Sequence, residues 1–199
     1  MSVIIGNTAE ETLIWADTAG QVTDEATYGA AIDKVFGVAA RSRILELYPS
    51  SEYPSPRRAF AQVTTDAEFT CKSRNVARAL SQAQKEPVYR YLFNHLLEND
   101  PRLKALGAAH TVEHLFLFAW QGSYRPTDND RALQRQVLGY WTRMAKTGNP
   151  NGSGDPEWPA VSKENDAYLE IGANTSAQRG PSGAHCDFWV STPMLWPHI

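Results

Sequence analysis

The feature that most constrains the fold is the placement of short β-branched segments between long helical stretches. Residues 2–6, 88–93 and 167–171 have the β-branched and aromatic composition of buried strands. Apolar residues recur with helical periodicity in the stretches between them, residues 25–48, 60–85 and 127–147. Strands that alternate with helices predict an α/β sheet. Three predicted strands are few for an independent doubly wound domain, which indicates part of a larger fold.

Residues 127–147 form the clearest predicted helix. Thr127 is a good N-cap residue, and Gly148 is placed to end the helix. One face is apolar and consists of Leu133, Val137, Trp141 and Met144.

Composition excludes some classes of protein. The net charge of −3 gives no reason to expect a nucleic-acid partner. No apolar run approaches the roughly 18–20 residues of a membrane span. Residues 1–6 are too few and too uncharged for a signal peptide and enter a strand at once, which we expect of a fragment.

His110 is the histidine with the most suggestive setting. It follows Gly107 in a loop of small residues beyond the second predicted strand. Ligands of α/β sheets gather at the carboxyl ends of strands, where a histidine can act as a general base. The alternative is a partly buried histidine with a structural hydrogen bond. Glu113 and His114 lie nearby, and His110 with His114 has the His-x-x-x-His spacing of some metal sites. That spacing brings two histidines together only on a helix and usually needs a third ligand, whereas the small residues here predict a loop, so no metal is expected.

Glu11 is the matching carboxylate candidate. It lies just beyond the first predicted strand, where a carboxylate can accept a hydrogen bond from a histidine. The alternative is a capping box, because Thr8 and Glu11 have the T-x-x-E spacing at the start of a predicted helix.

The nucleophile of a serine hydrolase is missing from the chain. No G-x-S-x-G string occurs, and the glycines at 152–154 and 180–183 have the wrong spacing. There is also no Gly-Gly run to provide oxyanion-hole amides. In α/β-hydrolases the catalytic residues follow the order serine, acid, histidine along the chain. A chain that begins after the serine would therefore contain candidates for the acid and the histidine but no nucleophile.

Two cysteines, Cys71 and Cys186, lie too far apart for a zinc motif or a redox Cys-x-x-Cys. They are either two unrelated buried thiols or a disulfide. A disulfide would close a loop of more than a hundred residues, worth roughly 4–5 kcal/mol in the chain-entropy model. It would also point to an exported parent protein.

Several strings, in order along the chain, resemble the type-B carboxylesterases and cholinesterases. They are I-G-N-T-A-E-E at residues 5–11, T-D-A-E-F-T-C at 65–71, G-A-A-H-T-V-E at 107–113, Y-W-T-R-M-A-K-T-G-N-P-N at 140–151 and C-D-F-W at 186–189. The string at residues 140–151 is highly specific to that family.

The resemblance implies roles for named residues and no cofactor. Glu11 is the triad acid, His110 the general base, and Cys71 with Cys186 the family's disulfide. Asp66 and Glu113 fall at positions that we interpret as structural support for the loop of His110. Two departures are that Thr111 and Thr12 stand where the family has glycine. A β-branched residue does not easily adopt a positive φ, so we expect Thr111 to reshape the loop.

The implied protein is a carboxylic ester hydrolase of the α/β-hydrolase fold, with residues 1–199 as the C-terminal portion of a single domain. Its expected partners are a small carboxylic ester and the missing N-terminal portion, with self-association of the isolated chain as a further expectation. The alternatives are an inactive cholinesterase-like binding module and a truncated product. Phe116, Trp120 and Tyr124 belong either to a substrate pocket or, as we favour, to ordinary packing.

Overall fold

The computed structural model describes residues 1–118, 120, 122–162, 164–180 and 183–192. The chain divides into two compact units. Residues Met1–Ala9 and Ser73–Pro181 form the first, which we call the sheet unit. Residues Glu10–Lys72 and Ser182–Ile199 form the second, the helical unit.

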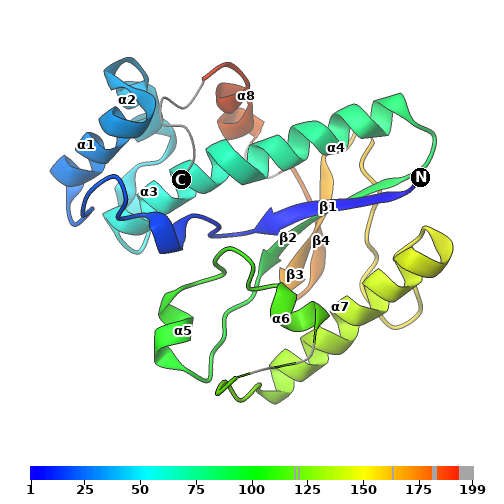
Figure 1. The fold of residues 1–199 in the computed structure, drawn as a ribbon. Coiled ribbons are helices and arrows are strands. Elements are labelled where there is room, and N and C mark those ends of the chain that lie inside the picture. Colours follow the sequence, from blue (N-terminus) through cyan, green and yellow to red (C-terminus); the bar gives the residue numbers. More distant parts are fainter. Residues whose placement is uncertain (119, 121, 163, 181–182, 193–199) are drawn as a thin grey trace. The chain divides into compact units, whose positions relative to one another are not determined.

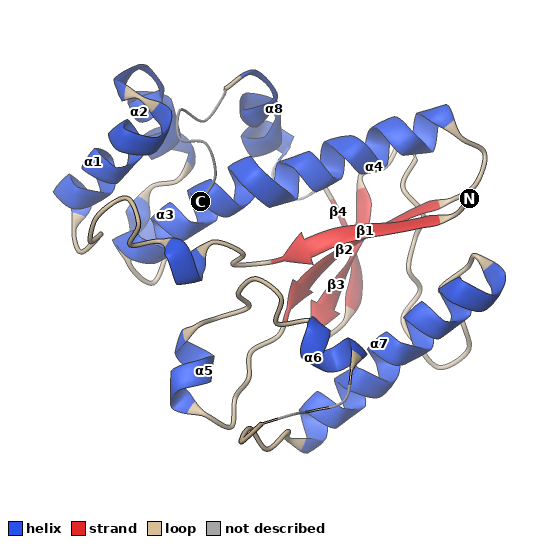
Figure 2. Ribbon diagram, viewed as in Figure 1, coloured by secondary structure: helices blue, strands red, loops and turns tan. Residues whose placement is uncertain are grey.

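The sheet unit is built on four strands in the order β1-β2-β3-β4. The first three are parallel, and β4 is antiparallel to β3, as Figure 2 shows. The strands are β1 (Val3–Thr8), β2 (Val88–Asn94), β3 (Ala167–Gly172) and β4 (Ser176–Arg179). The three predicted strands are thus confirmed, and β4 is an addition that the glycine- and serine-rich sequence did not indicate.

Helices cover both faces of this sheet (Figure 1). On one face α4 (Cys71–Ala83) packs Ala77 and Leu80 against Val88. On the other face lies α7 (Asp128–Thr147), whose buried side chains meet the alternate residues of the strands. That second core contains Leu133, Val137 and Tyr140 of α7 with Tyr89, Phe93, Leu169 and Ile171 of the sheet.

The ends of α7 are those that the sequence predicted. Thr127 accepts a hydrogen bond from the Asp130 backbone, and the Asp130 side chain accepts one from the Thr127 backbone, a complete capping box. Gly148 ends the helix with a φ of 74°, a left-handed conformation that glycine adopts without strain.

The connection from β2 to α7 contains two short helices, α5 (Pro101–Ala105) and α6 (His114–Leu117). The helix α5 is not among the elements predicted from the sequence. Asp100 caps α5 through the backbone N–H groups of Arg102 and Leu103, and proline occupies its first position.

In the part of the helical unit that the structure describes, every regular element is a helix. The helices are η1 (Leu13–Trp15), α1 (Glu25–Phe36), α2 (Val38–Leu47), η2 (Ser50–Glu52), α3 (Pro56–Thr65), the π-helix η3 (Asp66–Thr70) and α8 (Gly183–Ser191).

A disulfide between Cys71 and Cys186 fastens α8 to the start of α4, with Cα atoms 5.0 Å apart. The disulfide prediction is confirmed. Beside it, the buried Tyr48 donates a hydrogen bond to Asp66 at 2.9 Å and accepts one from Trp189 at 2.8 Å. Tyr48 is fully buried, although a stretch rich in proline and serine follows it.

The predicted capping box of Thr8 and Glu11 is wrong. Thr8 is the last residue of β1, and a turn rather than a helix follows it. The strand propensity of residues 3–8 and the pairing of Thr8 with Phe93 on β2 outweigh the local T-x-x-E spacing. None of the helices in the described segments is both long enough and apolar enough to cross a membrane.

Candidate functional site

The histidine loop, which we define as residues 107–113, lies in the sheet unit beyond the carboxyl end of β2. Gly107 adopts a φ of 70°, and Ala108 and Ala109 are buried. His110 follows them and is partly exposed. The small residues let the backbone of the loop approach the core, while the imidazole stays within reach of solvent. The predicted loop conformation is therefore confirmed.

Thr111, next to His110, has a φ of 70° and is the single non-glycine residue with a positive φ in the described part of the chain. We expected the threonine to avoid this region and reshape the loop, and that expectation is wrong. A left-handed conformation costs a residue with a Cβ roughly 1–2 kcal/mol. Surrounding contacts must impose such strain, and it clusters at functional sites.

The end of the histidine loop is held by local hydrogen bonds. The Val112 N–H donates to the Ala109 carbonyl at 3.1 Å, and the His114 N–H donates to the Thr111 carbonyl at 3.0 Å. The Tyr91 hydroxyl donates to Glu113 Oε1 at 3.5 Å. Glu113 thus joins the end of the loop to the middle of β2, and its supporting role stays a prediction.

Glu11 lies in the helical unit, in the turn that follows β1, and is 3% exposed. Its neighbour Thr12 is bound to α3: the Thr12 hydroxyl donates to the Ala61 carbonyl at 2.8 Å and lies 2.6 Å from the Thr64 hydroxyl. The threonine that replaces the family's glycine therefore anchors this turn. Glu11 and His110 belong to different units, and their pairing stays a prediction.

Asp66 is almost fully buried within the helical unit. It accepts hydrogen bonds from Tyr48 at 2.9 Å and from Gln62 at 2.9 Å, and His185 Nδ1 lies 3.7 Å away. Tyr48, which also accepts a hydrogen bond from Trp189, connects Asp66 with α8, the helix that carries Cys186. The support of the histidine loop by Asp66 stays a prediction.

The sequence did not reveal a second histidine–carboxylate pair. His95, one residue beyond β2, places Nε2 2.7 Å from Asp130 Oδ1, and both residues are buried. Asp130 Oδ2 accepts hydrogen bonds from the Tyr124 hydroxyl at 2.7 Å and from the Thr127 N–H at 2.7 Å. The T-x-x-D capping box at residues 127–130 is the signal that marks Asp130, but nothing in the sequence marks His95 as its partner.

The electrostatics of this cluster keep Asp130 ionised. Burial works against ionisation, but hydrogen bonds from Tyr124, Thr127 and His95 outweigh it and lower the pKa of Asp130 below its usual range. Burial, together with the bond to Asp130, raises the pKa of Tyr124 to about 12. Tyr124 therefore remains a hydrogen-bond donor at neutral pH.

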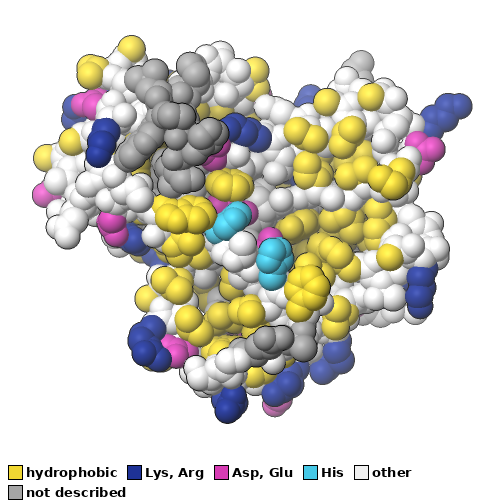
Figure 3. Space-filling model, viewed as in Figure 1, with side chains coloured by type: hydrophobic (Ala, Val, Ile, Leu, Met, Phe, Trp, Pro, Cys, Tyr) yellow, Lys and Arg dark blue, Asp and Glu magenta, His cyan; other side chains and the backbone are white. Residues whose placement is uncertain are grey.

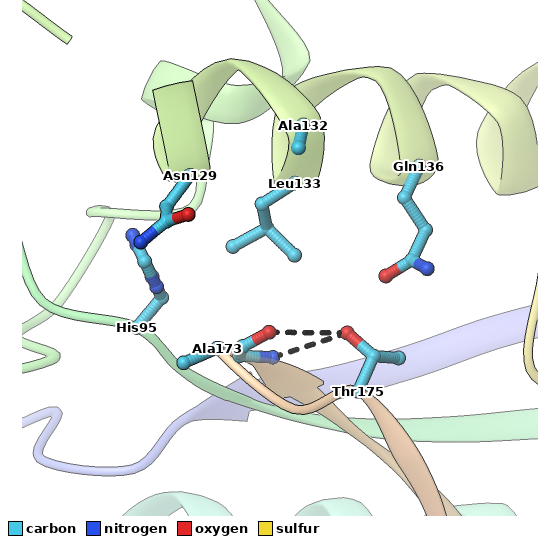
Figure 4. A pocket seen from close by; sticks show the side chains of 8 residues that line it. His95, Asn129, Ala132, Leu133, Gln136, Ala173 and Thr175 are labelled. Carbon is cyan, nitrogen blue, oxygen red and sulfur yellow. Dashed lines mark hydrogen bonds between the residues drawn. The ribbon is translucent and has the colours of Figure 1, made fainter. Parts of the chain in front are cut away.

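A cavity of about 210 Å³ lies beside His95, between the first turns of α7 and the β3–β4 turn (Figure 4). Thr175 faces it from the turn, where its hydroxyl is bonded to Gly172. Its lining mixes polar and small residues: His95, Asn129, Ala132, Leu133, Gln136, Gly172, Ala173 and Thr175.

A second hollow, of about 410 Å³, lies along β1, and we call it the β1 pocket. A Cβ at Gly6 would come within 2.3 Å of the Tyr91 ring, so the glycine lets Tyr91 lie across the strand. Figure 3 shows hydrophobic side chains gathered on this face, around β1 between α4 and α7. The lining residues are Ile4, Ile5, Gly6, Tyr91, Glu113, His114, Leu117 and Trp141.

Phe116, Trp120 and Tyr124 form a row of contacting rings, the first pair edge-to-face with centroids 5.0 Å apart and the second pair tilted with centroids 5.6 Å apart. All three pack in the hydrophobic core between α7 and the sheet, and Tyr124 also donates a hydrogen bond to Asp130 in the first turn of α7. This agrees with the packing interpretation. No group of metal-ligating side chains is present in the described residues.

Comparison with known proteins defines the family. The model of the carboxylesterase family matches residues 3–189. The chain is 32% identical to a cocaine esterase of Homo sapiens over 138 residues, 65% of this chain and 24% of that protein. It is 32% identical to liver carboxylesterase 1 of Oryctolagus cuniculus over 142 residues, 69% of this chain and 24% of that protein.

The chain therefore belongs to the carboxylesterase family and has that family's α/β-hydrolase fold. The mixed sheet, with helices on both faces, agrees with this assignment. The match covers only about a quarter of the length of the curated relatives.

Proposed function

We propose that residues 1–199 are the C-terminal portion of a single α/β-hydrolase domain that hydrolyses small carboxylic esters. In this proposal the chain supplies Glu11 as the acid and His110 as the general base. The nucleophilic serine belongs to an N-terminal portion. The chain order serine, acid, histidine of this fold supports that division.

In the proposed chemistry His110 takes up one proton and gives it back in each half of the reaction. His110 takes the proton of the serine hydroxyl as the serine attacks the ester carbonyl, and then gives it to the departing alcohol. Water releases the acid from the acyl-enzyme by the same route. Glu11 stabilises the imidazolium that forms in each step. Backbone N–H groups of the N-terminal portion bind the oxyanion.

The observation that carries the proposal is the strained backbone at Thr111. A threonine in the left-handed region is strained, and here it stands next to a partly exposed histidine. Such strain clusters at functional sites. Together with the family match over residues 3–189, the strain favours a working site over an inert loop.

The N-terminal portion is proposed to continue the sheet beside β1. β1 pairs with β2 along one edge, and the strand order leaves its other edge without a partner in the described sheet. The β1 pocket and the hydrophobic side chains around it lie next to this strand. An edge strand with apolar surroundings is a template for a further strand, which also accounts for the expected self-association of the isolated chain.

The first alternative is an inactive cholinesterase-like binding module, and the second is a truncated product. The presence of both Glu11 and His110 argues against the binding module. The disulfide between Cys71 and Cys186 favours an oxidising compartment for the parent protein.

The test is hydrolysis of short-chain p-nitrophenyl esters by the purified 199-residue chain beside its His110→Ala variant. Without a serine on a nucleophile elbow and without an oxyanion hole, neither protein should show turnover above the buffer rate. Robust turnover that disappears in the variant would place the nucleophile within residues 1–199 and contradict the proposed division of the site.

A further inference from the structure

We propose that the first two turns of α7 position the histidine loop through two side chains, Asp130 and Gln134. The proposal rests on the proposed function insofar as His110 is the general base. The histidine loop lies in the middle of a connection of residues 95–127. A connection of this length adopts one conformation only if something outside it holds it in place.

Asp130 holds the first part of the connection. Its carboxylate binds His95 Nε2, at the exit from β2, and the Tyr124 hydroxyl, near the entry to α7. Asn99 joins the same cluster, because its side-chain amide donates to the Arg125 carbonyl at 2.8 Å. The segment that leads from β2 toward the histidine loop is thus bonded to α7 through His95 and Asp130, and through Asn99 to Arg125, which lies just before the helix.

Gln134 holds the part that follows the loop. Its side-chain amide donates to the carbonyls of Leu115 at 3.3 Å and Phe118 at 2.9 Å, and its oxygen accepts from Trp120 Nε1 at 3.0 Å. The two carbonyls belong to Leu115, within α6, and to Phe118, its C-cap.

The hold continues from α6 to the histidine. The His114 N–H donates to the Thr111 carbonyl, and the Val112 N–H donates to the Ala109 carbonyl. The first of these bonds follows His110, and the second closes a turn that contains it. A contact of Gln134 with α6 therefore reaches His110 through consecutive hydrogen-bonded turns, and it helps to impose the strained φ of Thr111.

This arrangement also assigns a role to His95. Its ring is 3% exposed and its Nε2 is committed to an ionised carboxylate. His95 is a positioning residue and not a second general base. Catalytic groups must be held to within about 0.5 Å of their productive geometry, and such precision depends on supporting hydrogen bonds of this kind.

The experiment is amide hydrogen exchange on the 199-residue chain, read at the Val112 and His114 amides. Gln134→Met keeps the length of the side chain but removes all three hydrogen bonds. We expect both amides to exchange about tenfold faster or more in this variant. Ala77 amide exchange, in α4 on the opposite face of the sheet, should change less than about twofold.

Asn151→Leu is the matched control. Asn151 makes two hydrogen bonds with the backbone of Trp158, near the other end of α7. Its loss should leave the Val112 and His114 amides within about twofold of the parent. Equal acceleration in both variants would mean a general loss of stability and would overturn the proposal. So would an unchanged rate in Gln134→Met.

If Gln134→Met does not fold, Tyr124→Phe decides, since it removes a single hydroxyl from the Asp130 cluster. Exchange at the two amides should rise by about threefold or more, and no rise contradicts the proposal. In the enzyme completed with its N-terminal portion, Gln134→Met should lower kcat and leave KM unchanged. If His110→Gln leaves ester turnover intact in that completed enzyme, the proposed function fails. The amide exchange rates still test separately whether Asp130 and Gln134 position the histidine loop.

Discussion

Two histidines of the sheet unit follow the same strand and differ in every respect that matters for chemistry. His95 is buried, and its Nε2 is bound to an ionised carboxylate that has its own full set of donors. His110 is partly exposed and stands beside a threonine in a strained conformation. A satisfied, buried cluster stabilises one structure, whereas an accessible group in a strained loop is available for reaction.

The largest effect on stability should come from Asp130→Ala. It leaves the buried His95 ring, the Tyr124 hydroxyl and the Thr127 N–H without their acceptor, which should lower the free energy of unfolding by about 3–5 kcal/mol. Urea unfolding of the variant measures this. Asp128→Ala, which removes an exposed carboxylate from the same helix end, should cost less than about 1 kcal/mol. Similar losses for both variants would mean that the buried hydrogen bonds of Asp130 stabilise the fold no more than an exposed carboxylate at the same helix end.

Tyr124→Phe sharpens the comparison by removing one donor to the carboxylate. A hydrogen bond to a charged acceptor contributes about 1.5–3 kcal/mol, so the free energy of unfolding should fall by an amount near the lower limit. In an Asp130→Asn background the same substitution should cost clearly less, because the acceptor is no longer charged. A double-mutant cycle measures the coupling, and strictly additive effects would contradict it.

Thr111→Gly addresses the other histidine. Glycine adopts a φ of 70° without the Cβ clash, and after allowance for its freer unfolded state the protein should gain about 0.5–1 kcal/mol. Thr111→Ala keeps the Cβ and should give no such gain. Thermal unfolding of the three proteins compares them. A loss of stability in the glycine variant would show that the loop is not strained.

The smallest effect should appear in the pH dependence of stability. The pKa of Asp130 is lowered in the folded chain, chiefly because its hydrogen bonds outweigh the cost of burial. Its contribution is therefore present above the ordinary aspartate pKa of about 3.9 and is lost as the pH falls through the lower, folded value. The difference in unfolding free energy between the parent and Asp130→Asn should shrink below about pH 4. A constant difference would contradict the shift.

Much of the fold follows from local patterns. Strand residues such as those of β1 and β2 are β-branched or aromatic, and α7 has both its caps and its apolar face in the sequence. The strand β4 and the helix α5 were missed, because β4 depends on its pairing with β3 and α5 is only five residues long. The false capping box at Thr8 is the reverse case, where sheet pairing overrode a local motif.

The candidate site was only partly predictable for the same reason. The loop of His110 and the disulfide between Cys71 and Cys186 follow from family strings. The contact of His95 with Asp130 joins residues 35 positions apart, and no periodicity encodes it. The left-handed Thr111 was also unpredictable, because local preference opposes it and only the surrounding contacts impose it.

The measurement that tests this account most directly is ester turnover by the chain assembled with an N-terminal portion that carries a G-x-S-x-G serine. Two variants are compared, His110→Gln and His95→Gln. The account predicts that His110→Gln lowers kcat by at least about 10³-fold at unchanged stability. His95→Gln should lower stability and reduce kcat far less in the folded fraction. Full turnover in His110→Gln, or an equal loss of kcat in folded His95→Gln, would contradict the account.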